Sequence, residues 1–290
     1  MTNMKLVRIL GLFAILFLAT GGCVAQGVSS SAPLSLSDQI QRVRGSVVKI
    51  VVVRLDLRET PLAQSVQCPF THVTCVVGSG FIVDEHGDVV TALHVVDGVT
   101  EVMEELANVH IEGKALISIE VPNHVAGGGV YLGNQVTSEY KVVASDKAHD
   151  IALLSNIDPL PKDVSPVSFD LDRRRDGEDV FACGYPLGAL ELTTTSGHVA
   201  TSWAQHSLLT AKKYGILEES EVIRLDLRAN PGSSGGPIFS SSNQSVIGLA
   251  DEVSGLPGGW IAIAVPSVYI TDLLTKNGVS WKSSAAINEH

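Results

Sequence analysis

The stretch Asn230–Phe239, NPGSSGGPIF, places two adjacent serines inside a frame of glycines. A serine hydroxyl becomes a strong nucleophile only when a neighbouring base takes its proton. Glycines allow the main chain and a substrate to come close together, because no side chain blocks the approach. The stretch therefore raises two questions: whether Ser233 or Ser234 is a nucleophile, and which fold presents it.

Residues 232–236 fit two catalytic motifs that belong to different folds. In the G-x-S-x-G elbow of α/β-hydrolases the serine lies between a strand and a helix, and the acid and the histidine follow it. In the G-x-S-G-G turn of trypsin-like proteases the histidine and the aspartate precede it, in that order. Pro237 and the serine-rich stretch beyond it make a poor helix, and the only later histidine is His290. The sequence favours the second motif.

Among nine histidines, His94 is the best candidate for the base. It lies in VVTALHVVDG, where an apolar strand runs into a tight segment that can hold an imidazole rigidly. His72 and His86 lie in polar turn-like segments and His198 lies in a strand pattern. A single histidine is more often structural than catalytic. His94 is a candidate because a serine and an acid accompany it.

Asp150 is the best candidate for the acid, since it opens the apolar strand DIALL and can be buried there against an imidazole. A turn or cap residue is the simpler interpretation of this aspartate. Asp146 and Asp97 are its competitors, but Asp97 follows His94 by only three residues and could hardly reach the ring from behind.

These residues together predict acyl transfer. His94 would take the proton of Ser234 as its oxygen attacks a carbonyl, and Asp150 would hold the imidazole tautomer. The N–H groups of Gly232 and Ser234 would form the oxyanion hole. Ser233 has no such place, because only Ser234 directly precedes the Gly-Gly pair.

The chain predicts an all-β fold, because short apolar segments recur at intervals of roughly ten residues. Examples are VVKIVVVRL, KALISIEV and GWIAIAVPS. GSGFIVD and DVVTALHVV flank the turn EHG and are expected to form a hairpin. Helices are expected over DQIQRVRGS, capped by Ser37 or Asp38, over EVMEELANV, and over SVYITDLLTKNG, which ends at Gly278. The glycine-rich stretch AGGGVYLG lacks any nucleotide-binding spacing and is interpreted as a loop.

Composition excludes several classes of function. The net charge is -11 and no basic run is interleaved with aromatics, which argues against nucleic-acid binding. The chain contains neither H-E-x-x-H nor paired C-x-x-C, so no metal and no other cofactor is expected.

The first residues resemble an export signal. Two basic residues precede the apolar run ILGLFAILFLA and the small residues TGGC. This indicates a signal peptide over residues 1–22, with cleavage before Cys23 and lipidation of Cys23 favoured over cleavage after Ala25. Residues 23–37 would be a linker. Export to an oxidising compartment would let Cys68 and Cys75 form a disulfide, whereas Cys183 is expected to be an unreactive buried thiol.

Several motifs, in order, resemble the protease domain of the HtrA/Deg group of trypsin-like serine proteases. In chain order the motifs are GSGFIVDEHGDVVTALHVVDG, SDKAHDIALL, GYPLG, TSGHVATS, NPGSSGGPIF, VIGLA and IAIAVPS. The resemblance implies a chymotrypsin-like fold of two perpendicular β-barrels over residues 38–277, followed by a tail over 278–290. Carried over, the triad is His94, Asp150 and Ser234.

The chain departs from the group's pattern in a few places. Ala92 replaces the usual Asn before the histidine and Ser233 replaces the usual Asn before the serine, and neither change removes a catalytic atom. The segment 108–137 is longer than the group's core needs. Only 23 residues follow Ser267, too few for the PDZ domain of many relatives, so regulation through such a domain is not expected.

Specificity is expected to depend on Arg228, Ala229 and Ala262. In trypsin-like enzymes the place of Arg228, six residues before the serine, is the floor of the specificity pocket. A cation there would favour acidic side chains, unless Arg228 pairs with Asp226, which lies on the same face of the strand. A loop over 251–259 and the strand GWIAIAV would wall the pocket, and their small residues fit small or aliphatic side chains.

The leading hypothesis is thus an exported serine endopeptidase that acts on protein or peptide substrates, including unfolded ones by analogy with relatives. One alternative is a non-hydrolytic binding protein on the same fold. Another is an esterase that uses the same triad. Lipidated at Cys23, the protein would be anchored to the bacterial envelope; otherwise it would be soluble in the periplasm or outside the cell.

Overall fold

The structure is a computed structural model that describes residues 34–56, 73–97, 113–121, 135–156, 165–189, 191–205, 220–256 and 259–284. Several expectations lie outside these residues: the signal peptide and Cys23, the helix over 101–109, and the loop over 126–133. The same holds for Cys68 and for the side chain of Cys75, so their disulfide stays a prediction.

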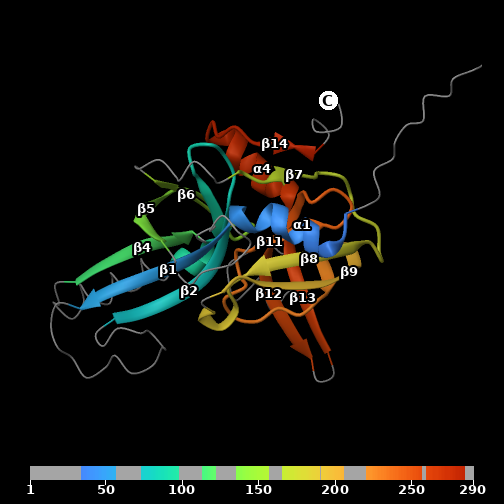
Figure 1. Cartoon of the computed structure of the whole chain (residues 1–290), viewed down its shortest axis with the longest axis horizontal. Helices are drawn as coiled ribbons and strands as arrows, with labels where there is room; N and C mark the ends of the chain where they lie inside the picture. Colours follow the sequence, from blue (N-terminus) through green and yellow to red (C-terminus); the bar gives the residue numbers. More distant parts are fainter. Residues whose placement is uncertain are drawn as a thin grey trace, which may run out of the picture. The chain divides into compact units, whose positions relative to one another are not determined.

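The first half of the chain forms a closed barrel with the strand order β1-β2-β3-β6-β5-β4. Its strands are β1 (Val47–Asp56), β2 (Val73–Ile82), β3 (Val89–Ala92), β4 (Gly113–Val121), β5 (Gln135–Asp146) and β6 (Ile151–Asn156). Every neighbouring pair is antiparallel. The hairpin expected from sequence is present as β2–β3, in which Phe81 pairs with Val90 and Ile82 with Val89. Figure 1 shows these strands, blue to green, on one side of the molecule.

The second half forms a sheet with the order β11-β8-β9-β10-β13-β12-β7-β14, in which β11 also pairs with β12. That extra pairing joins β11, β8, β9, β10, β13 and β12 into a second ring. The strands are β7 (Ser168–Phe169), β8 (Asp179–Gly184), β9 (Thr193–Gln205), β10 (Glu221–Asp226), β11 (Pro237–Ser240), β12 (Val246–Leu256), β13 (Gly259–Pro266) and β14 (Lys282–Ser283). A short 3-10 turn, η2 (Pro186–Gly188), follows β8. The predicted all-β double barrel is confirmed.

One apolar cluster contains side chains from both halves. Phe81 on β2, Phe169 on β7 and Phe239 on β11 all belong to it and are fully buried. The rings of Phe81 and Phe169 lie 6.2 Å apart between centroids. A separate cluster of branched aliphatic residues and alanines fills the second ring. Because the main core is shared, we expect the two halves to unfold together.

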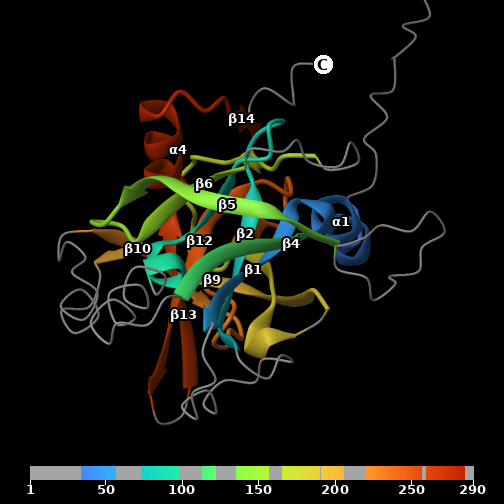
Figure 2. The same cartoon turned by 90° about the vertical axis from the view of Figure 1, so that its left-hand side faces the viewer.

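In the described part of the chain, the helices α1 (Leu36–Val43) and α4 (Ser267–Lys276) flank the strands, and a 3-10 turn, η1 (Arg44–Ser46), links α1 to β1. Figure 2 shows α1 and α4 well apart on the strand framework. The expected cap of the first helix was wrong: the N-cap is Ser35, whose hydroxyl accepts the N–H of Asp38. Asp38 belongs to the first turn instead, where its carboxylate accepts the Ser35 hydroxyl at 2.6 Å.

The last helix ends as expected. Gly278 has φ +73° and follows the C-cap Asn277, and the N–H of Val279 returns to the carbonyl of Leu274 at 3.0 Å. Glycine adopts this left-handed conformation without steric cost. Among the described residues, no helix is long and apolar enough to cross a membrane.

Candidate active site

The two serines lie in the tight turn between β10 and β11. Gly232 has φ +93°, and a Cβ atom on it would lie 2.7 Å from the Tyr185 carbonyl oxygen. Gly235 has φ +83°, and its Cβ would lie 2.2 Å from the Ser79 carbonyl oxygen. Both glycines are therefore required by the backbone conformation and by the close approach of neighbouring chain segments.

The amides of this turn divide into two groups. Those of Ser233, Gly235 and Gly236 donate to main-chain carbonyls at 2.7–3.0 Å. Those of Gly232 and Ser234 donate to no acceptor within the described part of the chain. These two N–H groups are the pair that the sequence predicts for an oxyanion hole, and the fold leaves both available to a ligand.

Ser79 on β2 connects the serine turn to the first barrel through hydrogen bonds. Its buried hydroxyl donates to the Gly232 carbonyl at 2.7 Å and accepts the Tyr185 N–H at 2.9 Å. Its own N–H donates to the Ser234 carbonyl at 2.9 Å. Sequence reasoning missed this role, since a serine in GSGFIV gives no sign of which distant segments it will bond.

His94 and Asp150 come from the first barrel and meet beside this turn. β3 ends at Ala92, and residues 93–97, which include His94, are helical. Asp150 precedes β6, is almost fully buried, and accepts from His94 twice. Its Oδ2 lies 2.5 Å from His94 Nδ1, and its Oδ1 accepts the His94 N–H at 2.9 Å. The main-chain oxygen of Asp150 also accepts the N–H of Leu93 at 2.9 Å.

This geometry sets the histidine tautomer. A carboxylate accepts hydrogen bonds, so the proton of a neutral His94 ring lies on Nδ1 and leaves Nε2 as an acceptor. The His94 side chain is 27% exposed, so the ring edge remains accessible.

The competing residues are engaged elsewhere. Asp146 lies 2.7 Å from Nδ1 of His149, whose ring stacks on Tyr269 at 3.7 Å between centroids. Asp97 is exposed. His86 is 90% exposed in its turn and His198 lies on β9, so neither approaches the serine turn through any contact among the described residues.

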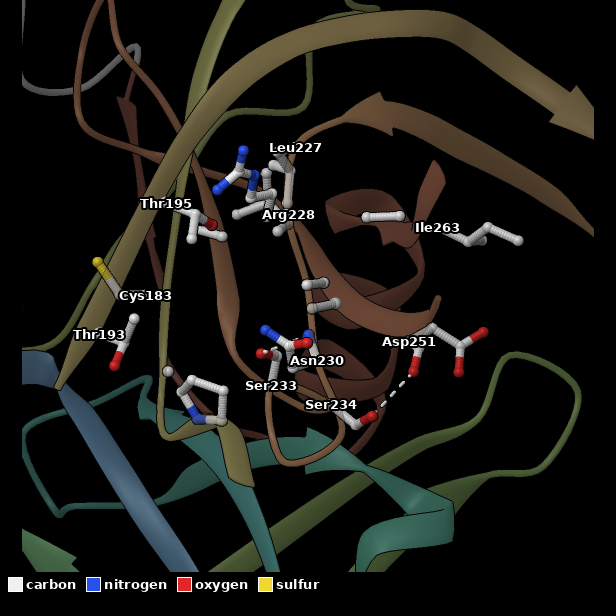
Figure 3. A pocket seen from close by; sticks show the side chains of 17 residues that line it. Cys183, Thr193, Thr195, Leu227, Arg228, Asn230, Ser233, Ser234, Asp251 and Ile263 are labelled. Carbon is white, nitrogen blue, oxygen red and sulfur yellow. Dashed lines mark hydrogen bonds between the residues drawn. The ribbon is translucent and has the colours of Figure 1, made fainter. Parts of the chain in front are cut away.

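The Ser234 hydroxyl donates to the main-chain oxygen of Asp251, on β12, at 3.0 Å (Figure 3). A hydroxyl has one proton, so in this rotamer the proton is not directed at His94. The carboxylate of Asp251 is fully buried, and its Oδ1 lies 3.9 Å from His94 Nδ1. Asp251 was also missed from sequence, although an acidic residue in the apolar segment VIGLAD was a signal.

A pocket opens beside Ser234, and its lining contains the predicted specificity residues Arg228, Ala229 and Ala262. Residues 251–256 belong to β12, so the loop predicted over 251–259 is wrong for that part. In Figure 3, Arg228 and Thr195 lie at the end of the cavity away from Ser234. Most of the remaining lining is small or apolar: Leu227, Ile238, Ala250 and Ile263.

Arg228 is exposed and forms no ion pair with Asp226, although both side chains are described. The pairing considered from sequence is therefore absent. Cys183 also lines the cavity. Burial raises the pKa of its thiol to about 11, with partial opposition from the Thr194 hydroxyl at 3.4 Å. Near neutral pH almost none of this group is in the reactive thiolate form, which agrees with the prediction that Cys183 is unreactive.

Comparison with known proteins assigns the family. A family model described as a trypsin-like peptidase domain matches residues 78–249, more than half of the chain. The chain belongs to the trypsin-like peptidase family. The matched span runs from β2 through the serine turn to β12 and includes His94, Asp150 and Ser234.

Curated relatives of this trypsin-like peptidase belong to the HtrA/Deg group, which confirms the resemblance seen in the sequence. Protease Do-like 1, chloroplastic, of Arabidopsis thaliana is 30% identical over 198 residues, 65% of this chain and 36% of that protein. A probable periplasmic serine endoprotease DegP-like of Brucella suis biovar 1 is 31% identical over 206 residues, 69% of this chain and 33% of that protein. The chain thus spans about one third of the length of these relatives.

Solved structures show the same fold. The HtrA-type protease AlgW with decapeptide has a TM-score of 0.59 and 19% identity, over 84% of this chain and 67% of that one. The serine endoprotease from Yersinia pestis has a TM-score of 0.54 and 21% identity, over 85% of this chain and 67% of that one.

Proposed function

We propose that this trypsin-like peptidase is a serine endopeptidase in which Ser234 is the nucleophile, His94 the base and Asp150 the acid. The observation that carries the proposal is the hydrogen bond between His94 Nδ1 and the buried Asp150 carboxylate. This bond leaves Nε2 as the nitrogen that can accept a proton. The serine turn nearby offers two N–H groups, those of Gly232 and Ser234, that donate to no acceptor among the described residues.

The chemistry follows from these positions. Nε2 of His94 takes the Ser234 proton while Oγ attacks the carbonyl of a peptide bond, and the amides of Gly232 and Ser234 stabilise the oxyanion. The imidazolium, paired with Asp150, then gives its proton to the leaving amine. Water attacks the resulting acyl-enzyme with His94 again as the base, which releases the second product and restores the serine.

Before Oγ can attack, the Ser234 proton must turn away from the Asp251 carbonyl that accepts it in this structure. Rotation of the hydroxyl about its Cβ–Oγ bond redirects this proton without moving the main chain. The same bond is the observation that favours the alternative function, a binding protein on a peptidase fold. In that case the hydroxyl would keep this bond permanently and no acyl-enzyme would form.

We propose protein or peptide substrates. A related protease of the same fold is described with a decapeptide, and relatives are named as periplasmic endoproteases. Those names also support export of this protein, and lipidation at Cys23 remains part of the proposal. In the cavity, the small and apolar walls support small or aliphatic side chains before the cleaved bond.

Labelling with a fluorophosphonate probe tests the proposed function. We expect the purified protein and its Ser233→Ala variant to be labelled, and Ser234→Ala to remain unlabelled, because only Ser234 lies before the Gly-Gly pair. Labelling would be followed by digestion of casein, which separates an endopeptidase from an esterase. A folded protein that is never labelled would instead support the binding function.

A further inference from the structure

Asp251 occupies an irregular point of β12. The register of the β12–β13 pairing shifts between Ala250, which lies opposite Ala264, and Glu252, which lies opposite Ile263, and Asp251 lies at this shift. Such a bulge redirects one residue of a strand. Here it brings the main-chain oxygen of Asp251 to Ser234 and its carboxylate toward His94. In Figure 3 the carboxylate points away from the cavity.

The result is a group of two buried carboxylates beside one imidazole. A ring nitrogen of His94, a carboxylate oxygen of Asp150 and a carboxylate oxygen of Asp251 all lie within 4.8 Å of one another. Asp150 is in hydrogen-bond contact with Nδ1, whereas Asp251 Oδ1, at 3.9 Å, is beyond that range. Asp251 therefore acts on the ring through its charge, and burial limits screening of that charge by solvent.

Three segments contribute polar or charged groups to the surroundings of the His94 ring. β12 contributes Asp251, the residue before β6 contributes Asp150, and the serine turn contributes the Ser234 hydroxyl. Within the helical segment of His94, Asp97 is exposed. His149, next to Asp150 in the chain, is paired with Asp146. Asp150 and Asp251 are thus the two acids that face the His94 ring in the described residues.

We propose that Asp251 is a positioning residue that stabilises the imidazolium form of His94 together with Asp150, and thereby sets the pH range of activity. This inference rests on the proposed function. A protonated His94 relieves the repulsion between the two carboxylates, so Asp251 favours proton uptake by the ring. The charge of Asp251 stabilises the imidazolium of the free enzyme at low pH. The same interaction stabilises the imidazolium that forms in the transition state.

Two consequences follow when the charge is removed. In Asp251→Asn, the free ring should lose its proton at lower pH, so the acid limb of the rate profile should move down by about one pH unit. The rate on the plateau should fall about tenfold, because the transition state loses the same stabilisation. A purely structural role would lower the rate without moving the limb.

The experiment measures the second-order rate constant of fluorophosphonate labelling against pH. The full chain is compared with Asp251→Asn, Asp251→Ser and the matched control Asp97→Asn, each checked for folding by circular dichroism. We expect a lowered limb in both Asp251 variants and an unchanged limb in Asp97→Asn. An unchanged limb in whichever neutral variant folds overturns the role of Asp251. No labelling of the unmodified protein at any pH overturns the proposed function, and this inference with it.

Discussion

Asp150 presents its carboxylate from a left-handed backbone conformation, with φ +55°. Asparagine tolerates this conformation, so Asp150→Asn should preserve the fold. Its amide group, however, would face Nδ1 of His94 and favour the tautomer with the proton on Nε2. We expect kcat to fall about ten-thousand-fold, with little change in the thermal midpoint. Asp146→Asn, which changes the aspartate paired with His149, is the control and should leave kcat nearly unchanged. Wild-type kcat in Asp150→Asn would remove Asp150 from the mechanism.

At the same scale, sequence could identify His94, Asp150 and Ser234 as candidates because each lies in a motif whose order along the chain is diagnostic. It did not place Asp251 in the site, although an acid in an apolar segment was a signal. Whether a strand residue points inward depends on register, and a bulge at Asp251 shifts that register by one residue. Ser79 was missed for a related reason, since its partners Gly232 and Tyr185 are distant in sequence.

At the scale of elements, a buried ion pair supports the segment between β7 and β8. Arg174 donates to Asp170 at 2.9 Å, and both side chains are at least nine-tenths buried. The amide group of Asn243 donates to the same carboxylate at 2.7 Å, which ties this segment to the β11–β12 turn.

Arg174→Met should lower the free energy of unfolding by about 3 kcal/mol, because it leaves the buried carboxylate of Asp170 without its cation. The neighbouring Arg173 is 66% exposed and pairs with Glu221 at 3.3 Å, so Arg173→Met should cost less than about 1 kcal/mol. Urea unfolding of both variants measures the difference. Equal losses would show that the Arg174 pair contributes no more than a surface pair.

For elements, sequence performed best where apolar segments are bounded by turn residues. β13 and α4 fall within their predicted segments, and β1 extends one residue beyond its segment, to Asp56. The first helix was displaced because three neighbouring polar residues compete for its cap, and Ser35 prevails by a reciprocal pair of bonds with Asp38. The local sequence pattern could not predict which strands pair to close the barrels. The pairings of β1 with β4 and of β11 with β12 join segments that periodicity alone cannot match.

At the scale of the whole molecule, Cys183 links folding stability to alkaline pH. Burial raises the pKa of its thiol from an ordinary value near 9 to about 11. Below about pH 9 the thiol is protonated in both folded and unfolded chains, and its contribution is complete. Between about pH 9 and 11 the unfolded chain releases this proton while the folded chain keeps it, so the folded state loses stability as pH rises. Because the main core includes Cys183 and extends through both halves, this loss should appear in global unfolding.

We therefore expect the free energy of unfolding to fall by about 1 kcal/mol more in the unmodified protein than in Cys183→Ala when pH rises from about 8 to about 10. The alanine variant is the reference, because other groups that titrate in this range are shared and cancel in the difference. The cavity left by the missing sulfur lowers stability equally at both pH values and cancels as well. Urea titrations at the two pH values measure the four free energies. Equal falls in the two proteins would mean that the thiol ionises as easily in the folded core as in the unfolded chain.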